Sequence, residues 1–156
     1  MIPTYRKLLV TTDLSPLGNA AIPHAYAVLA ERGGTVVLCH VVEVPGPPNP
    51  LYAHYSPGRA LSGNEREALR EALLRDLEQL VPEEVRTRQV IATEVRVVET
   101  EESVHEAICQ EAKVLDADLI VMASHGHSGM ARLVLGSVAE RVLRAADRPI
   151  LIVRSP

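Results

Sequence analysis

Short apolar runs recur along the chain, and longer segments with helical spacing of apolar residues separate them. Such continuous runs are typical of parallel strands buried on both faces. They predict strands at 7–12, 35–42, 93–98, 119–123 and 150–153, with helices at 16–31, 64–80, 104–115 and from 137 to just before 149. The alternation predicts one α/β domain over residues 1–156, with a mostly parallel five-stranded sheet and helices on both faces.

Local signals mark where several of these helices begin. Ser15 suits the N-cap of a helix whose first residue is Pro16. Pro23 either kinks that helix or marks its true first turn. Ser103 and Glu106 fit a capping box. In the helix at 64–80, one face carries Leu69, Leu73, Leu77 and Leu80.

A proline- and glycine-rich segment at about 45–63 interrupts this pattern and argues against regular structure there. Loops of this length are often lids or binding loops. Tyr52, His54 and Tyr55 lie within it. Two interpretations stay open: a cover that stacks on a base or contacts a partner, or a loop whose rings pack on the domain's own surface.

Composition narrows the class of protein. The 156 residues include neither Phe nor Trp, so an aliphatic core is predicted. A net charge of −4 argues against a general nucleic-acid or membrane-surface binder. We find no signal-peptide pattern and no apolar run of membrane-spanning length, and therefore expect a cytoplasmic protein. Cys39 and Cys109 lie in apolar surroundings and are predicted to be buried, reduced thiols.

The last third of the chain, 118–154, holds the candidate chemistry. A strand runs into a small-residue loop at 124–129, and Gly136-Ser137 then opens a helix. Successive backbone N–H groups in such a loop, together with a helix N-terminus, can bind a phosphate. The alternative is structural: Ser137 and Glu140 fit a capping box, and Gly126 and Gly129 then only make a turn.

The same residues resemble the universal stress protein family. Its nucleotide-binding members show Gly, two residues, Gly, nine residues and then Gly-Ser or Gly-Thr. That register falls here on Ala123, Gly126, Gly136 and Ser137, so alanine replaces the first glycine. The opening LLVTTDLS, the stretch LCHVVE and the closing VLRAADRPILIVR are also typical of the family.

The resemblance implies a Rossmann-like three-layer sandwich with strand order 3-2-1-4-5 that binds ATP together with Mg²⁺. In that order the first and fourth strands are neighbours, and Asp13 converges with the glycine loop at the switch point of the sheet. Thr12, Asp13 and Val41 would line the adenine and ribose end. The whole implied set of nucleotide-binding residues is Thr12, Asp13, Val41, Met122, Ala123, His125, Gly126, Gly129, Gly136, Ser137 and Val138.

Several alternatives remain beside this interpretation. Asp13 could cap the helix that follows it. If the site needs a positive φ at Ala123, its methyl group interferes. His125 and His127 are two residues apart, which makes a weak metal site, and they could instead contact phosphate or face solvent. No G-x-S-x-G elbow and no G-K-[ST] loop occurs, so no catalytic residue is assigned.

The resulting functional prediction is a nucleotide-responsive stress module rather than an efficient enzyme. A nucleotide-independent interaction module of the same fold and a slow nucleotide hydrolase are the alternatives. An apolar terminal strand at 150–153 would leave a sheet edge able to pair with another chain, and the resemblance also favours a homodimer through this strand.

Overall fold

The computed structural model describes residues 1–44, 61–88, 90–125 and 135–154, and its centre is a parallel sheet. The strands are β1 (Lys7–Thr11), β2 (Gly34–Glu43), β3 (Ile91–Thr100), β4 (Leu119–Ala123) and β5 (Ile150–Val153). Their order is β3-β2-β1-β4-β5, and every pair of neighbours is parallel. The predicted α/β class and strand order are therefore confirmed.

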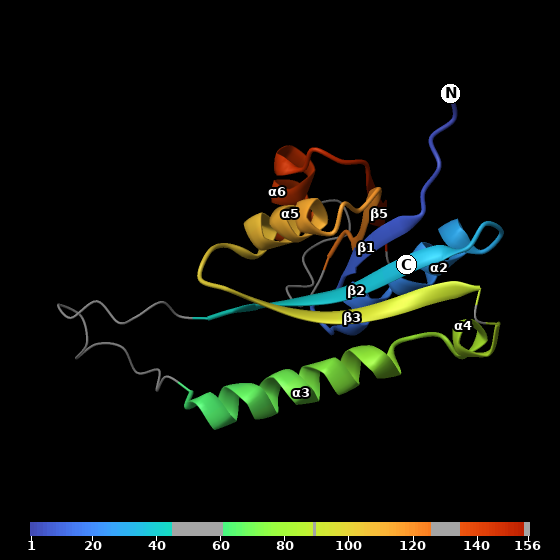
Figure 1. The fold of residues 1–156 in the computed structure, drawn as a ribbon. Helices are drawn as coiled ribbons and strands as arrows, with labels where there is room; N and C mark the ends of the chain where they lie inside the picture. Colours follow the sequence, from blue (N-terminus) through green and yellow to red (C-terminus); the bar gives the residue numbers. More distant parts are fainter. Residues whose placement is uncertain (45–60, 89, 126–134, 155–156) are drawn as a thin grey trace.

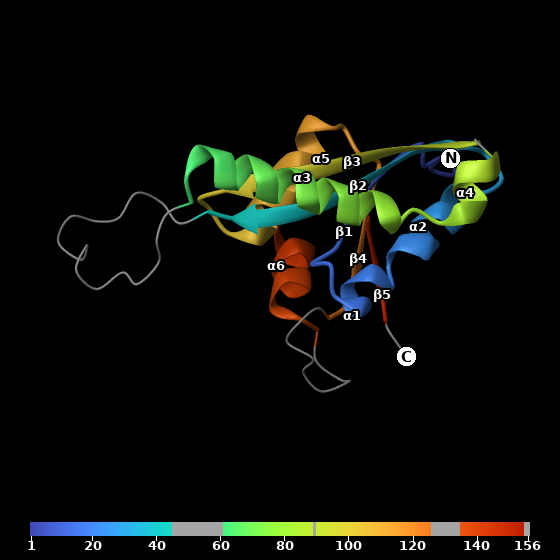
Figure 2. The ribbon, with the colours of Figure 1, turned by 90° about the horizontal axis from the view of Figure 1, so that it is seen from below.

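Helices cover both faces of the sheet (Figure 1). One face carries α2 (Ile22–Leu29), α3 (Gly63–Gln79) and α4 (Glu83–Arg88), and the other carries α5 (Val104–Val114) and α6 (Ser137–Ala145). A short α1 (Pro16–Asn19) follows β1. Figure 2 shows α1 and α6 at the same end of the sheet.

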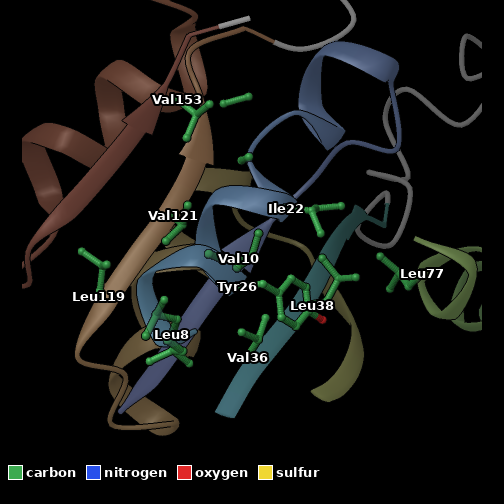
Figure 3. Close-up of a cluster of buried hydrophobic side chains, with 14 of the residues drawn as sticks. Leu8, Val10, Ile22, Tyr26, Val36, Leu38, Leu77, Leu119, Val121 and Val153 are labelled. Atoms are coloured by element: carbon green, nitrogen blue, oxygen red, sulfur yellow. The ribbon is translucent and has the colours of Figure 1, made fainter. Parts of the chain in front are cut away.

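Each face has its own core, and both are mainly aliphatic, as the composition predicted, with Tyr26 as the aromatic member of one of them. Figure 3 shows the face under α2 and α3, where strand residues such as Leu8 and Leu38 meet Ile22, Tyr26 and Leu77 from the helices. The opposite face holds Leu9, Val37, Cys39, Ile120 and Met122 from the strands, and Ile108, Ala112, Ala139 and Val142 from α5 and α6. Alternate strand residues thus point to opposite cores, and both faces of the central strands are buried.

Both cysteines are buried free thiols, as predicted. Burial raises the pKa of Cys39 to about 12, with the nearby Glu111 carboxylate adding to the shift. Burial also raises the pKa of Cys109. Because the thiolate is the reactive form, these side chains act in packing rather than in chemistry at neutral pH.

The prediction of a single helix at 16–31 is wrong, because the chain forms two helices there. The first ends at Asn19 and the second begins at Ile22, so Pro23 lies in the first turn of α2, where its missing N–H costs no intrahelical bond. Helix α2 ends at Leu29, and the turn into β2 passes through Gly33 and Gly34, whose positive φ values of 67° and 144° favour glycine.

The apolar face predicted for α3 is correct only in its second half. Leu77 is fully buried, and Leu73 and Leu80 pack against the same core, whereas Leu69 is 42% exposed. The predicted capping box of Ser103 and Glu106 is present. Helix α4 was not predicted; it is short and contributes only Val85 to the core, so it lacks a clear apolar period.

Two further features bear on the sequence predictions. The tyrosine-containing stretch around Tyr52, His54 and Tyr55 lies outside the described residues. Within the described ranges, no helix combines the length and apolar character needed to cross a bilayer.

Candidate functional site

A cavity of about 320 Å³ opens at the carboxyl ends of β1 and β4. The connection after β1 runs through α1 and α2 on one side of the sheet, and the connection after β4 runs through α6 on the other. The cavity therefore lies at the topological switch point, where open α/β sheets bind their ligands. It is lined by Thr11, Thr12, Asp13, Gly18, His40, Val41, Val104, Ile108, Met122, Ala123, Ser124, His125, Gly136, Ser137, Val138 and Ala139.

The structure brings the predicted site residues together in this cavity. Those within the described ranges all line it: Thr12, Asp13, Val41, Met122, Ala123, His125, Gly136, Ser137 and Val138. Gly126 and Gly129, like His127, fall outside the described residues. Asp13 thus lines one cavity with Ser124 and His125, the first two residues of the glycine loop, and with the start of α6, while the contact of these residues with a nucleotide stays a prediction.

Sequence reasoning missed several lining residues. Gly18 and His40 lie near Asp13 and Thr12, and Val104, Ile108 and Ala139 form an apolar wall from α5 and α6. The wall residues were missed because apolar residues with helical spacing indicate core first. His40 did carry a signal, since it is a polar residue inside the otherwise apolar run 36–42 of β2.

Thr12 is held in place by hydrogen bonds from four directions. Its N–H donates to the carbonyl of Cys39 at 3.1 Å, and its hydroxyl donates to Asn19 Oδ1 at 2.6 Å. That hydroxyl also accepts from the N–H of Leu14 at 2.9 Å, and its carbonyl accepts from His40 Nδ1 at 2.8 Å. Thr12 therefore shapes the cavity wall, because both its backbone and its hydroxyl already have protein partners.

The Asp13 carboxylate is held in a defined orientation beside Thr12. Its Oδ1 accepts from the N–H of Ser15 at 3.0 Å and from the Ser15 hydroxyl at 2.5 Å. A Cβ on Gly18 would lie 2.1 Å from the same oxygen, so the carboxylate occupies space that only glycine leaves. Leu14, between Asp13 and Ser15, has a φ of 65°, an uncommon left-handed conformation that this turn requires.

These bonds also settle how the first helix is capped. The N-cap is Ser15, whose hydroxyl accepts from the N–H of Gly18 at 2.9 Å. Asp13 orients this cap rather than acting as the cap itself. The carboxylate is thus fixed at the cavity wall by the same residues that begin α1.

The start of α6 forms the opposite side of the cavity. Gly136 is the N-cap residue, and its N–H donates to the carbonyl of Ser124 at 2.8 Å. The capping box expected from Ser137 and Glu140 is wrong: Ser137 is the first helical residue, and Glu140 accepts from Arg144 Nη2 at 2.8 Å. By helix geometry, the first N–H groups of α6 have no intrahelical acceptor, and the positive end of the helix dipole lies here.

Ser124 and His125 continue the wall from β4. The N–H of Ser124 donates to the carbonyl of Val153 at 2.8 Å, and its hydroxyl is hydrogen-bonded to His125 Nδ1 at 2.9 Å. Within the described ranges, Nε2 of His125 is buried without a hydrogen-bond partner. Buried polar atoms are rarely left unpaired, so this nitrogen marks a place where a ligand would gain a bond. The described residues contain no group of three or more side chains suited to a metal.

Ala123 fits its position without strain. It is the last residue of β4, is 8% exposed, and packs with the core under α2. Among the described non-glycine residues, positive φ occurs at Leu14 and Asp116 and not at Ala123. The backbone therefore does not require glycine here, and the alanine is compatible with the cavity as it stands.

Comparison with known proteins now identifies the family. The chain matches the profile of the universal stress protein family over residues 4–154. It belongs to this family. The match spans nearly the whole chain, including both sides of the cavity.

Individual relatives agree with this assignment. Universal stress protein MJ0531 of Methanocaldococcus jannaschii is 28% identical over 152 residues, which cover 97% of this chain and 84% of the relative. The solved structure of MJ0577 from the same organism is 25% identical, with a TM-score of 0.73 and 99% of both chains covered. A universal stress protein solved in complex with cAMP is 23% identical, with a TM-score of 0.65, and the alignment covers 99% of this chain and 100% of that protein. At 23% identity, this similarity establishes the shared fold.

Proposed function

We propose that this universal stress protein, as one domain, binds an adenine nucleotide, ATP with Mg²⁺, and acts as a nucleotide-responsive module. The observation that carries the proposal is the cavity at the switch point, which places the Asp13 carboxylate opposite the N-terminus of α6. Its volume of about 320 Å³ lies in the range of small-molecule sites. The cytoplasm is the location that we propose for this activity.

The chemistry of the wall suits the parts of a nucleotide. Val41, Val104 and Ile108 offer an apolar surface for a flat base, and Asp13 can accept hydrogen bonds from ribose hydroxyls. The first N–H groups of α6 and the buried Nε2 of His125 can meet phosphate oxygens. A solved family member in complex with cAMP supports the same ligand class. Bound Mg²⁺ would add positive charge beside the phosphates. Asp13 would lie at the nucleoside end of the ligand.

The test is isothermal titration of ATP with Mg²⁺ into the protein and into a matched pair of variants at Val138. This residue lies in the first turn of α6, is 37% exposed and lines the cavity. Val138→Glu adds a charge that suits a helix N-terminus, so the helix is retained while an anion is repelled. Val138→Gln introduces a side chain of almost the same size as glutamate but without its charge.

We expect micromolar binding by the parent protein and a clear loss in Val138→Glu only. Like charges about 8 Å apart repel by about 2 kcal/mol at an effective dielectric constant of about 20, and solvent screening lowers this toward a tenfold loss of affinity. Val138→Gln should stay within about threefold of the parent. Absence of heat at millimolar ATP, with an unshifted melting temperature, would instead favour the nucleotide-independent interaction module.

The hydrolase alternative is decided in the same samples by measuring release of ADP. We expect binding without sustained turnover, because the described lining supplies apolar and hydrogen-bonding groups that suit binding, and the sequence assigns no catalytic residue. Steady turnover that disappears in Asp13→Ala would assign enzymatic activity to this site instead.

We also propose a homodimer that forms through β5. This strand is the last in the described sheet, and its side chains are the apolar series Ile150–Val153. The carbonyls of Pro149 and Val153 accept from β4, so by strand alternation the backbone of Ile150 and Ile152 faces away from the sheet. An outward row of donors and acceptors on an apolar strand is suited to pairing with a second copy.

Light scattering at micromolar concentration should give twice the chain mass of 17.0 kDa. Ile152→Pro removes one outward N–H, and we expect it to shift the protein to monomer while circular dichroism keeps its α/β shape. A monomeric parent protein at these concentrations would refute the proposed dimer.

A further inference from the structure

We infer that His40 is a positioning residue for the nucleotide, which acts by fixing the peptide bond between Thr12 and Asp13. This inference rests on the proposed function of the cavity. The supporting contact joins His40 Nδ1 to the carbonyl oxygen of Thr12 at 2.8 Å. Both residues line the cavity.

The direction of this hydrogen bond follows from its partners. A carbonyl oxygen only accepts, so Nδ1 of His40 carries the hydrogen. The carbonyl belongs to the peptide unit that also contains the N–H of Asp13, and this unit is planar. Holding the oxygen therefore fixes the plane from which the Asp13 backbone and side chain begin.

Two further restraints act on the far side of Asp13. Ser15 donates twice to its Oδ1, and Gly18 leaves room for that oxygen. His40 supplies the restraint on the near side, and it comes from a different strand, 28 residues along the chain. The carboxylate is thus clamped from both ends, and removal of either clamp frees it to turn away.

The place of His40 in β2 links this clamp to the apolar wall. His40 and Val41 are consecutive strand residues, so their side chains point to opposite faces of the sheet. Val41 lies with the core under α5, while His40 reaches across to Thr12. One short piece of β2 therefore holds the proposed base surface and the proposed ribose acceptor in fixed relation.

The ribose is the part of the nucleotide whose binding would depend on His40. If Asp13 accepts hydrogen bonds from ribose hydroxyls, a misplaced carboxylate lowers the affinity for nucleotides that have those hydroxyls. The affinity for nucleotides without them stays unchanged. ATP and 2′,3′-dideoxy-ATP, each with Mg²⁺, are the two probes. Their base and phosphates are the same, so the comparison isolates the sugar contact.

The experiment compares His40→Asn with His40→Leu. The amide nitrogen of asparagine is bonded to Cγ, as Nδ1 of histidine is, and can donate to the Thr12 carbonyl, whereas leucine cannot. We expect His40→Leu to bind ATP at least about tenfold more weakly, because the ribose loses its hydrogen bond to the charged Asp13 carboxylate. His40→Asn should stay near the parent affinity, and dideoxy-ATP should bind all three proteins alike.

Amide hydrogen exchange without ligand gives an independent readout. The N–H of Ser15 donates to Asp13 Oδ1, so its protection reports the position of the carboxylate. We expect faster exchange of this amide in His40→Leu and parent-like exchange in His40→Asn. Unchanged protection in His40→Leu, or equal weakening of both nucleotides, would overturn the inference. A parent protein that binds no ATP would overturn the proposed function, while the exchange data still decide whether His40 positions Asp13.

Discussion

Leu9→Ala should lower the free energy of unfolding by about 3 to 5 kcal/mol, the upper part of the range for buried leucines. Leu9 is fully buried at the middle of β1, where its register partners are Val37 on β2 and Ile120 on β4. Strand pairing on both sides holds the backbone in place. The neighbours therefore cannot close the space that the lost methyl groups leave, and a cavity remains.

The aliphatic composition sharpens this expectation. The core around Leu9 is aliphatic, and Tyr5 and Tyr26 pack in the opposite core, so no large ring lies nearby to fill the gap. Chemical denaturation followed by circular dichroism measures the change, with Leu143→Ala as control. Leu143 is 54% exposed on α6, and its truncation should cost less than about 0.5 kcal/mol. A loss below about 1 kcal/mol for Leu9→Ala would show that α5 and α6 settle onto the sheet and refill the space.

The strands were predictable from the sequence because most of them are short apolar runs, and the family resemblance supplied their order. The boundaries differ from prediction by a few residues, most at β3, where the polar residues Glu94, Arg96 and Glu99 blur the pattern. Arg96 pairs with Glu111 of α5 at 2.6 Å, so a charge in this strand is satisfied by a helix that the strand pattern could not show.

Helix errors came from competition between local signals. Ser137 and Glu140 have the spacing of a capping box, yet Glu140 also lies four residues before Arg144 and pairs with it. Both arrangements are locally favourable, and sequence spacing does not rank them. The break between α1 and α2 had a clear signal in Pro23, whose two interpretations only the fold could separate.

The site was predictable where a residue contributes through its own chemistry, and less so where it acts through a distant partner. Asp13 follows the end of β1 and Ser137 begins α6, so both attract attention by type and position. Gly18 and His40 matter because of the space near Asp13 and the carbonyl of Thr12. Such relations appear only once the strands are placed side by side.

Gly136→Ala should impair the site more strongly than its single added carbon suggests. A Cβ at this position would lie 2.9 Å from the carbonyl oxygen of Ser124, which is tighter than real contacts allow. The obstacle is backbone, and the N–H of Gly136 is bonded to that same carbonyl at 2.8 Å. The start of α6 must therefore move away from β4, and with it the N–H groups that we expect to hold phosphate.

In Gly136→Ala we expect the free energy of unfolding to fall by about 1 to 3 kcal/mol, as for other overpacked sites. Nucleotide affinity should fall by about 10- to 100-fold if one charge-assisted hydrogen bond to phosphate is lost, a cost of about 1.5 to 3 kcal/mol. Titration with ATP and Mg²⁺ measures the second effect, and denaturation measures the first. Gly63→Ala is the matched control, because a Cβ at Gly63 meets nothing within 4 Å.

A third variant separates crowding from helix capping. Alanine is a poorer N-cap residue than glycine, whereas serine is a better one, yet serine carries the same Cβ. If the contact with Ser124 dominates, Gly136→Ser should weaken ATP binding as much as Gly136→Ala. Recovery of affinity in Gly136→Ser would show instead that glycine serves this helix only as a cap. Parent-like affinity in Gly136→Ala would mean that the start of α6 is not part of the phosphate site, and the proposed orientation of the nucleotide would then be wrong.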